Sequence, residues 1–265
     1  MKELQVITPQ VSVIMPVYNA KATVAASISS VLRQSFEYWE LIIIDDCSQD
    51  GSRKIVKSIA RGQPRIRLFS NKSNKGTAYS RNVGIAKSRG KWIAFLDSDD
   101  LWRVDKLEKQ VRLMQESGAL ISYTGTTYMD SEGDILKYYL KANQKLTYRE
   151  LLKRNIMSCS SVMVRRDVMK REMFSNGHLH EDYAAWMSIV KKVGYAHGLN
   201  EPLLTYRLSK GSKSSGRINS ALMTYRAYRY VRFSSLASFV LMLRYAMHSI
   251  TKRLSIRLGG FTSRR

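Results

Sequence analysis

Four apolar runs alternate with helical segments along the first hundred residues, and this alternation limits the possible folds more than any other feature. Runs such as ELIIIDD contain several consecutive Ile or Val residues, which is typical of strands buried on both faces. Strands that alternate with helices form βαβ units around a parallel sheet. We therefore expect an α/β fold with a mostly parallel sheet flanked by helices. The predicted strands are 11–17, 40–46, 65–70 and 91–97, and the predicted helices are 21–33, 52–60 and 77–88.

The pattern is less regular after the fourth predicted strand. We expect a helix over 105–116 and two further strands over 119–130 and 159–166. The segment 180–194 carries apolar residues at helical spacing, including Trp186, and this indicates an amphipathic helix that faces the core. The second half of the chain therefore adds strands and helices without a clean βαβ repeat.

An acidic cluster follows the fourth predicted strand in the stretch KWIAFLDSDDLW. Asp97, Asp99 and Asp100 repel one another, and burial would raise the free energy of ionising them. A helix that begins near Leu101, with Asp100 as its cap, would offset part of this repulsion. A divalent cation would offset more, because hard cations prefer clustered carboxylate oxygens. Ligands of parallel sheets bind outside the carboxyl ends of the strands, where this cluster lies.

Two common nucleotide-binding motifs are missing. A dinucleotide fold needs a GxGxxG turn after its first strand, and the stretch VIMPVYNAKA contains no glycine. No GxxxxGK[ST] phosphate loop occurs either. A bound diphosphate would therefore be neutralised by a metal or by basic side chains, and the acidic cluster favours the metal.

The charge of the chain is strongly positive and unevenly distributed. The 265 residues include 44 Lys and Arg against 21 Asp and Glu, which gives a net charge of +23, and no acidic residue follows Glu201. Such asymmetry indicates a polyanionic partner, either nucleic acid or an anionic membrane surface. Cys47 and Cys159 are far apart and form no CxxC motif, which favours a reducing compartment over a disulfide scaffold. The first ten residues lack an apolar core, so we expect no signal peptide.

Five motifs in order resemble the family 2 glycosyltransferases with the GT-A fold. They are VSVIMPVYNA, LIIIDDCSQD, KGTAYSRNVGI, FLDSDDLW and HEDYAAW, and the resemblance runs from about Val11 to Arg207. It implies a GT-A fold, a Rossmann-like and mostly parallel sheet flanked by helices. It also implies a nucleotide-sugar donor, a divalent metal (Mn²⁺ or Mg²⁺) and inversion at the anomeric carbon.

The resemblance also assigns roles on the donor side of the site. Asp99 would bind the ion that holds the donor diphosphate, and Asp97 would lie near the ribose. Arg81 would reach the ribose or the phosphates, or else form a salt bridge to the acidic cluster. We expect a weaker contact between Arg207 and the diphosphate.

A further set of residues would recognise the base of the donor. The resemblance implies that Asp46 accepts a hydrogen bond from the base, which suits the ring N–H of uracil better than adenine. Pro16 and Tyr18 match the opening loop of the family, where the tyrosine ring would border the base. Cys47 stands where the family usually has glycine, so the local loop shape could differ.

The pair Glu181–Asp182 matches the acidic pair that supplies the catalytic base in the family. Asp182 would take the proton of the acceptor hydroxyl during in-line attack, and Glu181 would contact the sugar or the acceptor. Asp182 is equally well placed to cap the helix 180–194. His178 and His180 precede the pair, but their spacing suits no standard zinc motif, and we expect a solvent-exposed loop there.

We expect a glycosyltransferase domain over 1–208 and a basic helical tail over 209–265, with 209–219 as a polar hinge. The tail is too interrupted by Arg244 to span a bilayer, and its pattern is that of an interfacial helix on an anionic membrane. The alternative is that its apolar stripe packs on the catalytic domain and its charges are solvated. Its apolar stripe comprises Tyr225, Tyr228, Leu236, Phe239, Val240, Leu243, Met247, Ile250 and Leu254. Its flanking cations are Arg226, Arg229, Arg232, Arg244, Lys252, Arg253 and Arg257.

These features favour a hexosyltransferase that uses a UDP-sugar and a lipid-linked glycan acceptor in bacterial surface polysaccharide (O-antigen or capsule) assembly. It would be cytoplasmic and peripheral on the inner face of the cell membrane. One alternative is a soluble transferase that modifies a protein or small molecule. Another is a basic nucleic-acid-binding protein, but the acidic cluster on the ligand face and the lack of a nucleic-acid-binding motif lead us to expect no nucleic acid partner. A catalytically silent sugar-binding relative is disfavoured because both acidic motifs are retained.

Overall fold

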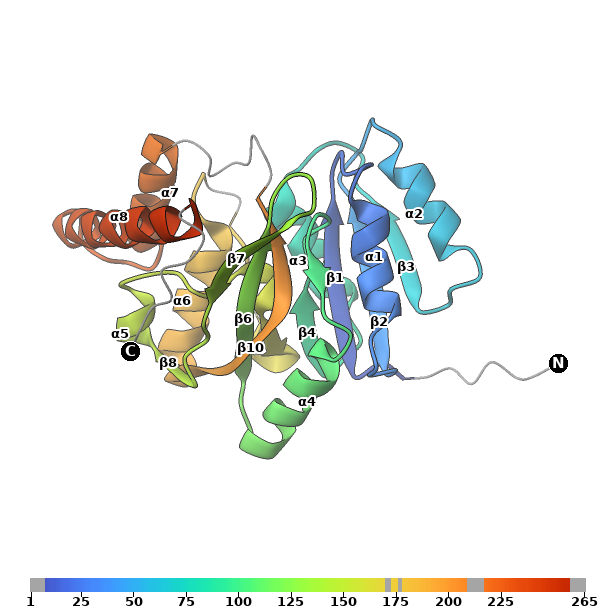
Figure 1. Cartoon of the computed structure of the whole chain (residues 1–265), viewed down its shortest axis with the longest axis horizontal. Helices are drawn as coiled ribbons and strands as arrows, with labels where there is room; N and C mark the ends of the chain where they lie inside the picture. Colours follow the sequence, from blue (N-terminus) through green and yellow to red (C-terminus); the bar gives the residue numbers. More distant parts are fainter. Residues whose placement is uncertain (1–7, 170–172, 176–177, 209–216, 258–265) are drawn as a thin grey trace.

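A computed structural model of the chain describes residues 8–169, 173–175, 178–208 and 217–257, and its elements are shown in Figure 1. The strands are β1 Val11–Val17, β2 Trp39–Asp45, β3 Ile66–Ser70, β4 Trp92–Phe95, β5 Leu101–Trp102, β6 Ile121–Met129, β7 Ile135–Leu140, β8 Lys145–Thr147, β9 Met163–Arg165 and β10 Tyr195–Arg207. The helices are α1 Val24–Leu32, α2 Ser52–Ala60, α3 Thr77–Lys87, α4 Lys106–Ser117, α5 Tyr148–Leu151, α6 Glu181–Val193, α7 Arg217–Tyr230 and α8 Ser235–Arg257. Short 3-10 turns occupy Cys159–Ser161 and Arg166–Val168.

One sheet runs through the molecule in the order β3-β2-β1-β4-β9-β6-β10-β5. The first four strands of this order are parallel, as the βαβ pattern predicts, and β6 and β10 form a further parallel pair. Strand β9 is antiparallel to both of its neighbours, β4 and β6, and so joins the two parallel parts. The α/β architecture with a mostly parallel sheet is therefore confirmed.

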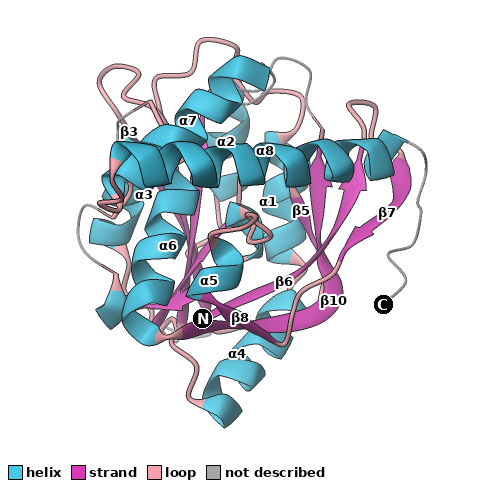
Figure 2. Ribbon diagram, turned by 90° about the vertical axis from the view of Figure 1, so that its left-hand side faces the viewer, coloured by secondary structure: helices cyan, strands magenta, loops and turns pink. Residues whose placement is uncertain are grey.

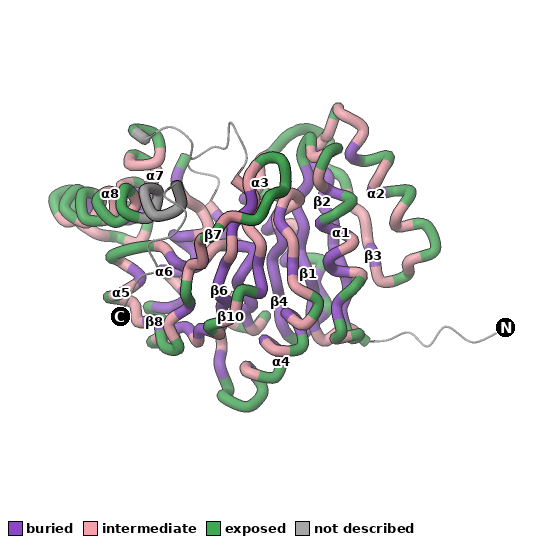
Figure 3. Tube along the Cα trace, in the orientation of Figure 1, coloured by how far each residue is buried: buried purple, intermediate pink, exposed green. Residues whose placement is uncertain are grey.

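Helices cover both faces of the sheet, which explains why the strands lack polar alternate positions. In β1, Val13 and Met15 pack into a core with α1, α2 and α4, while Ile14 packs into a second core with α3, α6 and α7. All seven residues of β1 and all seven of β2 are buried. Figure 3 shows this continuous buried region along the central strands.

The prediction of a helix near Leu101, capped by Asp100, is wrong. Leu101 and Trp102 form the short strand β5, which pairs with β10, and α4 begins at Lys106. Asp100 is 1% exposed, and its Oδ1 accepts a hydrogen bond from the backbone N–H of Arg207 at 3.0 Å. The carboxylate therefore fixes the end of β10 next to the acidic cluster.

The longest strand, β10, was not predicted from the sequence. Its middle contains Gly198, Asn200 and Pro202, residues that weaken or interrupt a strand pattern. The structure accommodates them with register shifts against β6 between Leu199 and Leu204. The predicted strand over 159–166 is shortened to β9, because Cys159–Ser161 forms a 3-10 turn.

Helices α7 and α8 pack together beside α6 (Figure 2). Residues 217–219 of the predicted hinge are helical, because α7 begins at Arg217; the rest of the hinge, 209–216, lies outside the described residues. Tyr228 of α7 is fully buried, and its hydroxyl lies 3.0 Å from that of Tyr183 in α6, so its predicted place on an outward stripe is wrong. None of the helices in the described part of the chain combines the length and apolar character needed to cross a bilayer.

Helix α3 lies very close to β1 at Gly84, and this contact generates a stability prediction. A Cβ at Gly84 would stand 2.4 Å from Cγ2 of the buried Ile14. We expect Gly84→Ala to lower the free energy of unfolding by about 1–3 kcal/mol, although alanine has the higher helix propensity. Denaturant unfolding measures the change. Ala86→Ser, at an exposed position of α3, is the control and should stay within about 0.5 kcal/mol; equal effects would refute the close contact.

Candidate active site

The predicted site residues gather at the carboxyl ends of β1, β2 and β4, at the upper edge of the sheet in Figure 1. Tyr18 follows β1, Asp46 follows β2 and Asp97 follows β4 by two residues. Neighbouring parallel strands end at the same edge, so motifs 80 residues apart in sequence meet in space. The sheet topology alone therefore assembles the donor-side motifs.

Arg81 of α3 connects two of the acidic motifs. Its Nη2 lies 2.6 Å from Oδ1 of Asp97, and its Nη1 lies 3.1 Å from Oε1 of Glu181. The arginine side chain is 4% exposed and also lies over the ring of Phe174. The salt bridge to the acidic cluster, one of the two expected roles of Arg81, is therefore present, and it extends to the acidic pair at the start of α6.

The surroundings of the acidic cluster do not fully offset the free energy of ionising its carboxylates. Burial raises the pKa of Asp100 well above its usual range, and the nearby charges of Asp99 and Asp97 raise it further. Its Oδ2 is buried without a hydrogen-bond partner. Burial and the same cluster also raise the pKa of Tyr206. The site therefore favours an added positive charge.

These carboxylates fit a divalent cation that is shared with a ligand. Within the described residues, no three His, Cys, Asp or Glu side chains are grouped to hold a metal by themselves. Magnesium is usually held by one or two carboxylates together with substrate phosphates. Asp99, adjacent in sequence to Asp100, whose Oδ2 is unpartnered, therefore suits a cation that arrives with a diphosphate.

Arg207 lies beside the acidic cluster. Its Nε donates to the backbone carbonyl of Asp99 at 3.1 Å. Ser160 is a second neighbour, which the sequence did not reveal: its Oγ accepts from the backbone N–H of Asp97, and its carbonyl accepts from Nε1 of Trp102. A serine in the polar segment SCSS gives no sequence signal for this contact.

Asp182 lies in the first turn of α6, but it does not cap the helix. The N-cap residue is His180, and Oδ1 of Asp182 accepts from the backbone N–H of its own neighbour, Tyr183, at 2.7 Å. Burial raises the pKa of Asp182, and the charge of Glu181 raises it further, while Arg81 and His180 oppose the shift. The helix ends at Val193, and Gly194 follows as its C-cap with a positive φ of 94°.

The two histidines before α6 do not form a metal pair with Glu181 in the described part of the chain. His178 is exposed, as expected for a solvent loop. His180 is half-buried, because its Nε2 lies 3.3 Å from Oγ of Ser220 in α7. His180 therefore links the segment of the acidic pair to α7.

Asp46 organises the loop that precedes α3. It is 2% exposed, and its oxygens accept from Nδ2 of Asn71 at 2.7 Å and from the backbone N–H groups of Lys75 at 2.9 Å and Gly76 at 2.7 Å. A carboxylate has about four acceptor positions, so the three bonds leave about one unused. Cys47, where the family usually has glycine, keeps a left-handed φ of 66°, so the residue changes while the backbone conformation expected of a glycine remains.

Pro16 lies in the predicted strand 11–17, which the structure confirms, and not in the opening loop where the resemblance places it. Pro16 is buried inside β1, opposite Ile44 of β2. The pairing of β1 with β4 ends at Ile14, so a residue without a backbone N–H is tolerated two positions later. The loop begins at Tyr18, whose side chain is 49% exposed.

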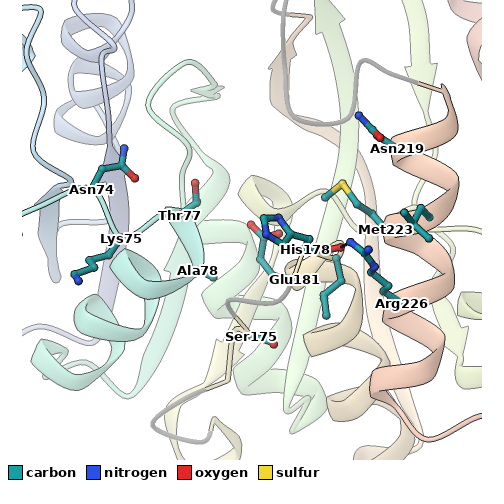
Figure 4. A pocket seen from close by; sticks show the side chains of 13 residues that line it. Asn74, Lys75, Thr77, Ala78, Ser175, His178, Glu181, Asn219, Met223 and Arg226 are labelled. Carbon is teal, nitrogen blue, oxygen red and sulfur yellow. Dashed lines mark hydrogen bonds between the residues drawn. The ribbon is translucent and has the colours of Figure 1, made fainter.

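A pocket of about 650 Å³ opens next to the acidic pair (Figure 4). The loop before α3 and the first turn of that helix line one side, and α7 lines the other. Glu181 and His178 lie between them, and Met223 and Arg226 reach from α7 toward these two residues. The pocket therefore adjoins the acidic pair on the side of α7.

The sequence profile described as Glycosyl transferase family 2 matches residues 12–172. A putative teichuronic acid biosynthesis glycosyltransferase, TuaG of Bacillus subtilis (strain 168), is 38% identical over 247 residues, covering 93% of this chain and 98% of that protein. The glucosyltransferase WfgD of Escherichia coli is 38% identical over 209 residues, covering 78% and 80%. Its name gives UDP-Glc as donor and α-D-GlcNAc-diphosphoundecaprenol as acceptor of a β-1,3 linkage.

Solved structures share the fold. TarS of S. aureus in complex with UDP superposes with a TM-score of 0.70 at 16% identity, covering 95% of this chain and 75% of that one. The mannosyltransferase PcManGT of Pyrobaculum calidifontis, in complex with GDP-Man and Mn²⁺, has a TM-score of 0.66 at 17% identity, covering 93% and 75%. Fold and carboxylate arrangement together define a glycosyltransferase with the GT-A fold. The chain belongs to glycosyltransferase family 2.

The environment of Asp182 predicts a gain in stability when its charge is removed. Because its folded-state pKa is raised, the folded protein loses stability as the pH rises through that pKa. We expect Asp182→Asn to raise the melting temperature at pH 7 by about 1–3 °C. The gain should disappear in acid, where the carboxyl is protonated in both the folded and the unfolded state.

Asp105→Asn is the matched control for this measurement. Hydrogen bonds from the Arg103 side chain lower the pKa of Asp105 to about 2, so its ionisation stabilises the folded state above pH 4. This variant should melt lower than the parent protein at pH 7. Differential scanning calorimetry from about pH 8 down to about pH 2.5, below the ordinary pKa of Asp, compares both variants. An unchanged or lower melting temperature at pH 7 for Asp182→Asn contradicts the assignment.

Proposed function

We propose that this enzyme transfers a hexose, with inversion, from a UDP-sugar to a hydroxyl of a lipid-linked glycan in bacterial surface polysaccharide assembly. The proposal rests mainly on the two ion pairs that Arg81 forms. They join Asp97, in the motif expected to meet the donor, to Glu181, next to the expected base. A transferase needs its donor and acceptor groups within one short reaction distance, and this connection supports such an arrangement.

The donor proposal rests on the residues beyond β1 and β2. The acceptor position left on Asp46 suits the ring N–H of uracil, and the exposed ring of Tyr18 can border the base. Pro16, buried in β1, acts through the shape of this edge rather than by contact. TarS, which shares the fold, was solved with UDP.

The residues on the diphosphate side are Asp97, Asp99 and Arg207. We assign Asp99 to a divalent cation, Mn²⁺ or Mg²⁺, and Asp97 to the ribose side, where Arg81 holds it in place. When bound, the cation supplies positive charge that stabilises the leaving nucleoside diphosphate. Arg207, fixed on the carbonyl of Asp99, supplies a further positive charge on the same side.

Asp182 is the proposed general base. It removes the proton of the acceptor hydroxyl while that oxygen forms a bond to the anomeric carbon. The bond from the anomeric carbon to the diphosphate oxygen breaks, and its electron pair leaves with the nucleoside diphosphate. Attack from the opposite face inverts the anomeric centre. The raised pKa suits Asp182 for this task, because bases work best with a pKa near the working pH. Glu181 is left to contact the sugar or acceptor.

A peripheral location on the cytoplasmic face of the membrane is supported by α8. Its outward side carries Leu236, Phe239, Val240, Leu243, Met247 and Ile250, each between 47% and 75% exposed. Its opposite side, with Leu241, Met242 and Tyr245, packs on the core. No acidic residue follows Glu201, so the tail suits an anionic bilayer. Residues 209–265 would thus be the membrane-binding appendage of a transferase domain over 1–208.

The transfer proposal predicts a requirement for metal and for Asp99. A panel of nucleotide sugars with Mg²⁺ or Mn²⁺ should show hydrolysis or transfer with UDP-sugars, and a chelator should stop it. Asp99→Asn should lose most activity and also the metal-dependent part of UDP binding, measured by calorimetry, because the amide is a poorer ligand. Full activity in chelator, or equal affinity for UDP and ADP, would contradict the proposal.

Asp182→Asn is the matched variant on the acceptor side. It should bind UDP and metal normally and lower kcat by about a hundredfold to ten-thousandfold, the usual contribution of a general base. If the variant keeps most of its turnover, another residue is the general base, and the donor assignment is unaffected.

The membrane proposal predicts a loss of liposome binding when the outward face of α8 becomes polar. Phe239→Gln with Leu243→Gln should weaken binding to anionic liposomes by about tenfold, because half-exposed apolar side chains lose their burial in lipid. Tyr38→Gln with Val104→Gln, two equally exposed apolar positions in the first half of the chain, is the control. Flotation of the full chain measures both. If the two variants float equally, or if the protein binds nucleic acid but not liposomes, membrane docking is rejected.

A further inference from the structure

The pocket beside Glu181 has a cationic wall that the donor-side residues do not explain. Arg226 lines this pocket from α7, and Asp97, Asp99 and Arg207 do not line it. The Nη1 atom of Arg226 donates to the carbonyl of His178 at 3.2 Å. Among the described residues, no carboxylate lies within ion-pair distance of Arg226, while Glu181, in the same pocket, is already paired with Arg81. The guanidinium is therefore available to an anion from outside the chain.

The opposite side of the pocket also favours an anion. The first turn of α3 reaches the pocket at Thr77 and Ala78, and no side chain caps this eleven-residue helix. The N–H groups of this first turn and the helix dipole give this end a partial positive charge, which the carboxylate of Asp46, bonded to the N–H of Gly76, partly offsets. Arg226 and the start of α3 thus face each other across the pocket, and Glu181 between them is already paired with Arg81. This arrangement suits a compact, strongly charged anion.

Apolar side chains border the same pocket next to the arginine. Met223 lines it one turn before Arg226 (Figure 4). The preceding residue, Leu222, also lines it and is 42% exposed. Helix α7 packs on α8, whose outward face is apolar. When an anion is attached to a hydrocarbon chain, the anion would therefore contact Arg226 and the chain would contact the apolar residues beside it.

We propose that this pocket binds the diphosphate that links the acceptor sugar to its lipid, with Arg226 as the principal cation. The inference rests on the proposed lipid-linked acceptor and names its binding subsite. In a sugar diphosphate the anion is separated from the accepting hydroxyl by one sugar ring. Glu181 and Arg226, on the wall of one pocket, would then hold the two ends of that sugar, with the hydroxyl toward Asp182.

Binding of a short lipid diphosphate tests the subsite directly. With UDP and Mg²⁺ saturating the donor side, decyl diphosphate should bind the full-length protein, and Arg226→Gln should weaken it by about tenfold through loss of a charge-assisted hydrogen bond. Arg229→Gln is the control, since Arg229 lies one turn away on α7, outside the pocket, and donates to the carbonyl of Phe233. No binding, or equal effects of the two variants, overturns the proposal.

Kinetics separate this subsite from the proposed function. With decyl-diphospho-GlcNAc as acceptor, Arg226→Gln should raise KM about tenfold and leave kcat and the donor KM unchanged. With decyl GlcNAc, which lacks the diphosphate, the variant and parent should not differ. If the parent protein transfers sugar to the diphosphate acceptor but Arg226→Gln keeps its KM, the subsite is wrong and the function stands. If decyl diphosphate binds through Arg226 but no diphosphate-linked sugar is an acceptor, the pocket binds an anion that is not part of the acceptor, and the subsite proposal falls together with the acceptor assignment.

Discussion

The two ion pairs of Arg81 are the interaction on which the arrangement of the site depends. The guanidinium belongs to α3, Asp97 follows β4, and Glu181 begins α6, so three elements from different parts of the chain meet at one nearly buried charge. Removing one partner from such a group leaves an uncompensated charge, typically at a cost of about 3–5 kcal/mol. The close contact of Gly84 with Ile14 sets the distance of α3 from the sheet, and thereby the position of Arg81.

The sheet supplies the rest of the geometry by ending its strands at one edge. The donor-side motifs follow β1, β2 and β4, while β10 returns to the same edge and brings Arg207 to the carbonyl of Asp99. Asp100 secures that return by binding the Arg207 backbone, although its own ionisation is disfavoured there. Stability is thus reduced locally where a ligand can restore it, a common property of functional sites.

The sequence predicted the parallel half of the sheet well because its strands are continuous apolar runs with helices between them. It failed where tertiary contacts override local pattern: Leu101 became a strand because β10 was available to pair. The ion pair between Arg81 and Asp97 was one of two expected roles, but the bond to Glu181, 100 residues away, has no local signal. Ser160 and Arg226 were not predicted as site residues for the same reason.

Helix α8 is apolar on two opposite sides, one packed on the core and the other outward, and the proposed docking of its outward side on a membrane would have a kinetic consequence. An enzyme held on a bilayer by such a face meets a lipid-linked acceptor by lateral diffusion within the surface. Its rate then follows the number of acceptors per unit of membrane area rather than their bulk concentration. Dilution of the acceptor with inert lipid would slow the reaction even at a constant total amount, whereas the water-borne donor would obey ordinary solution kinetics.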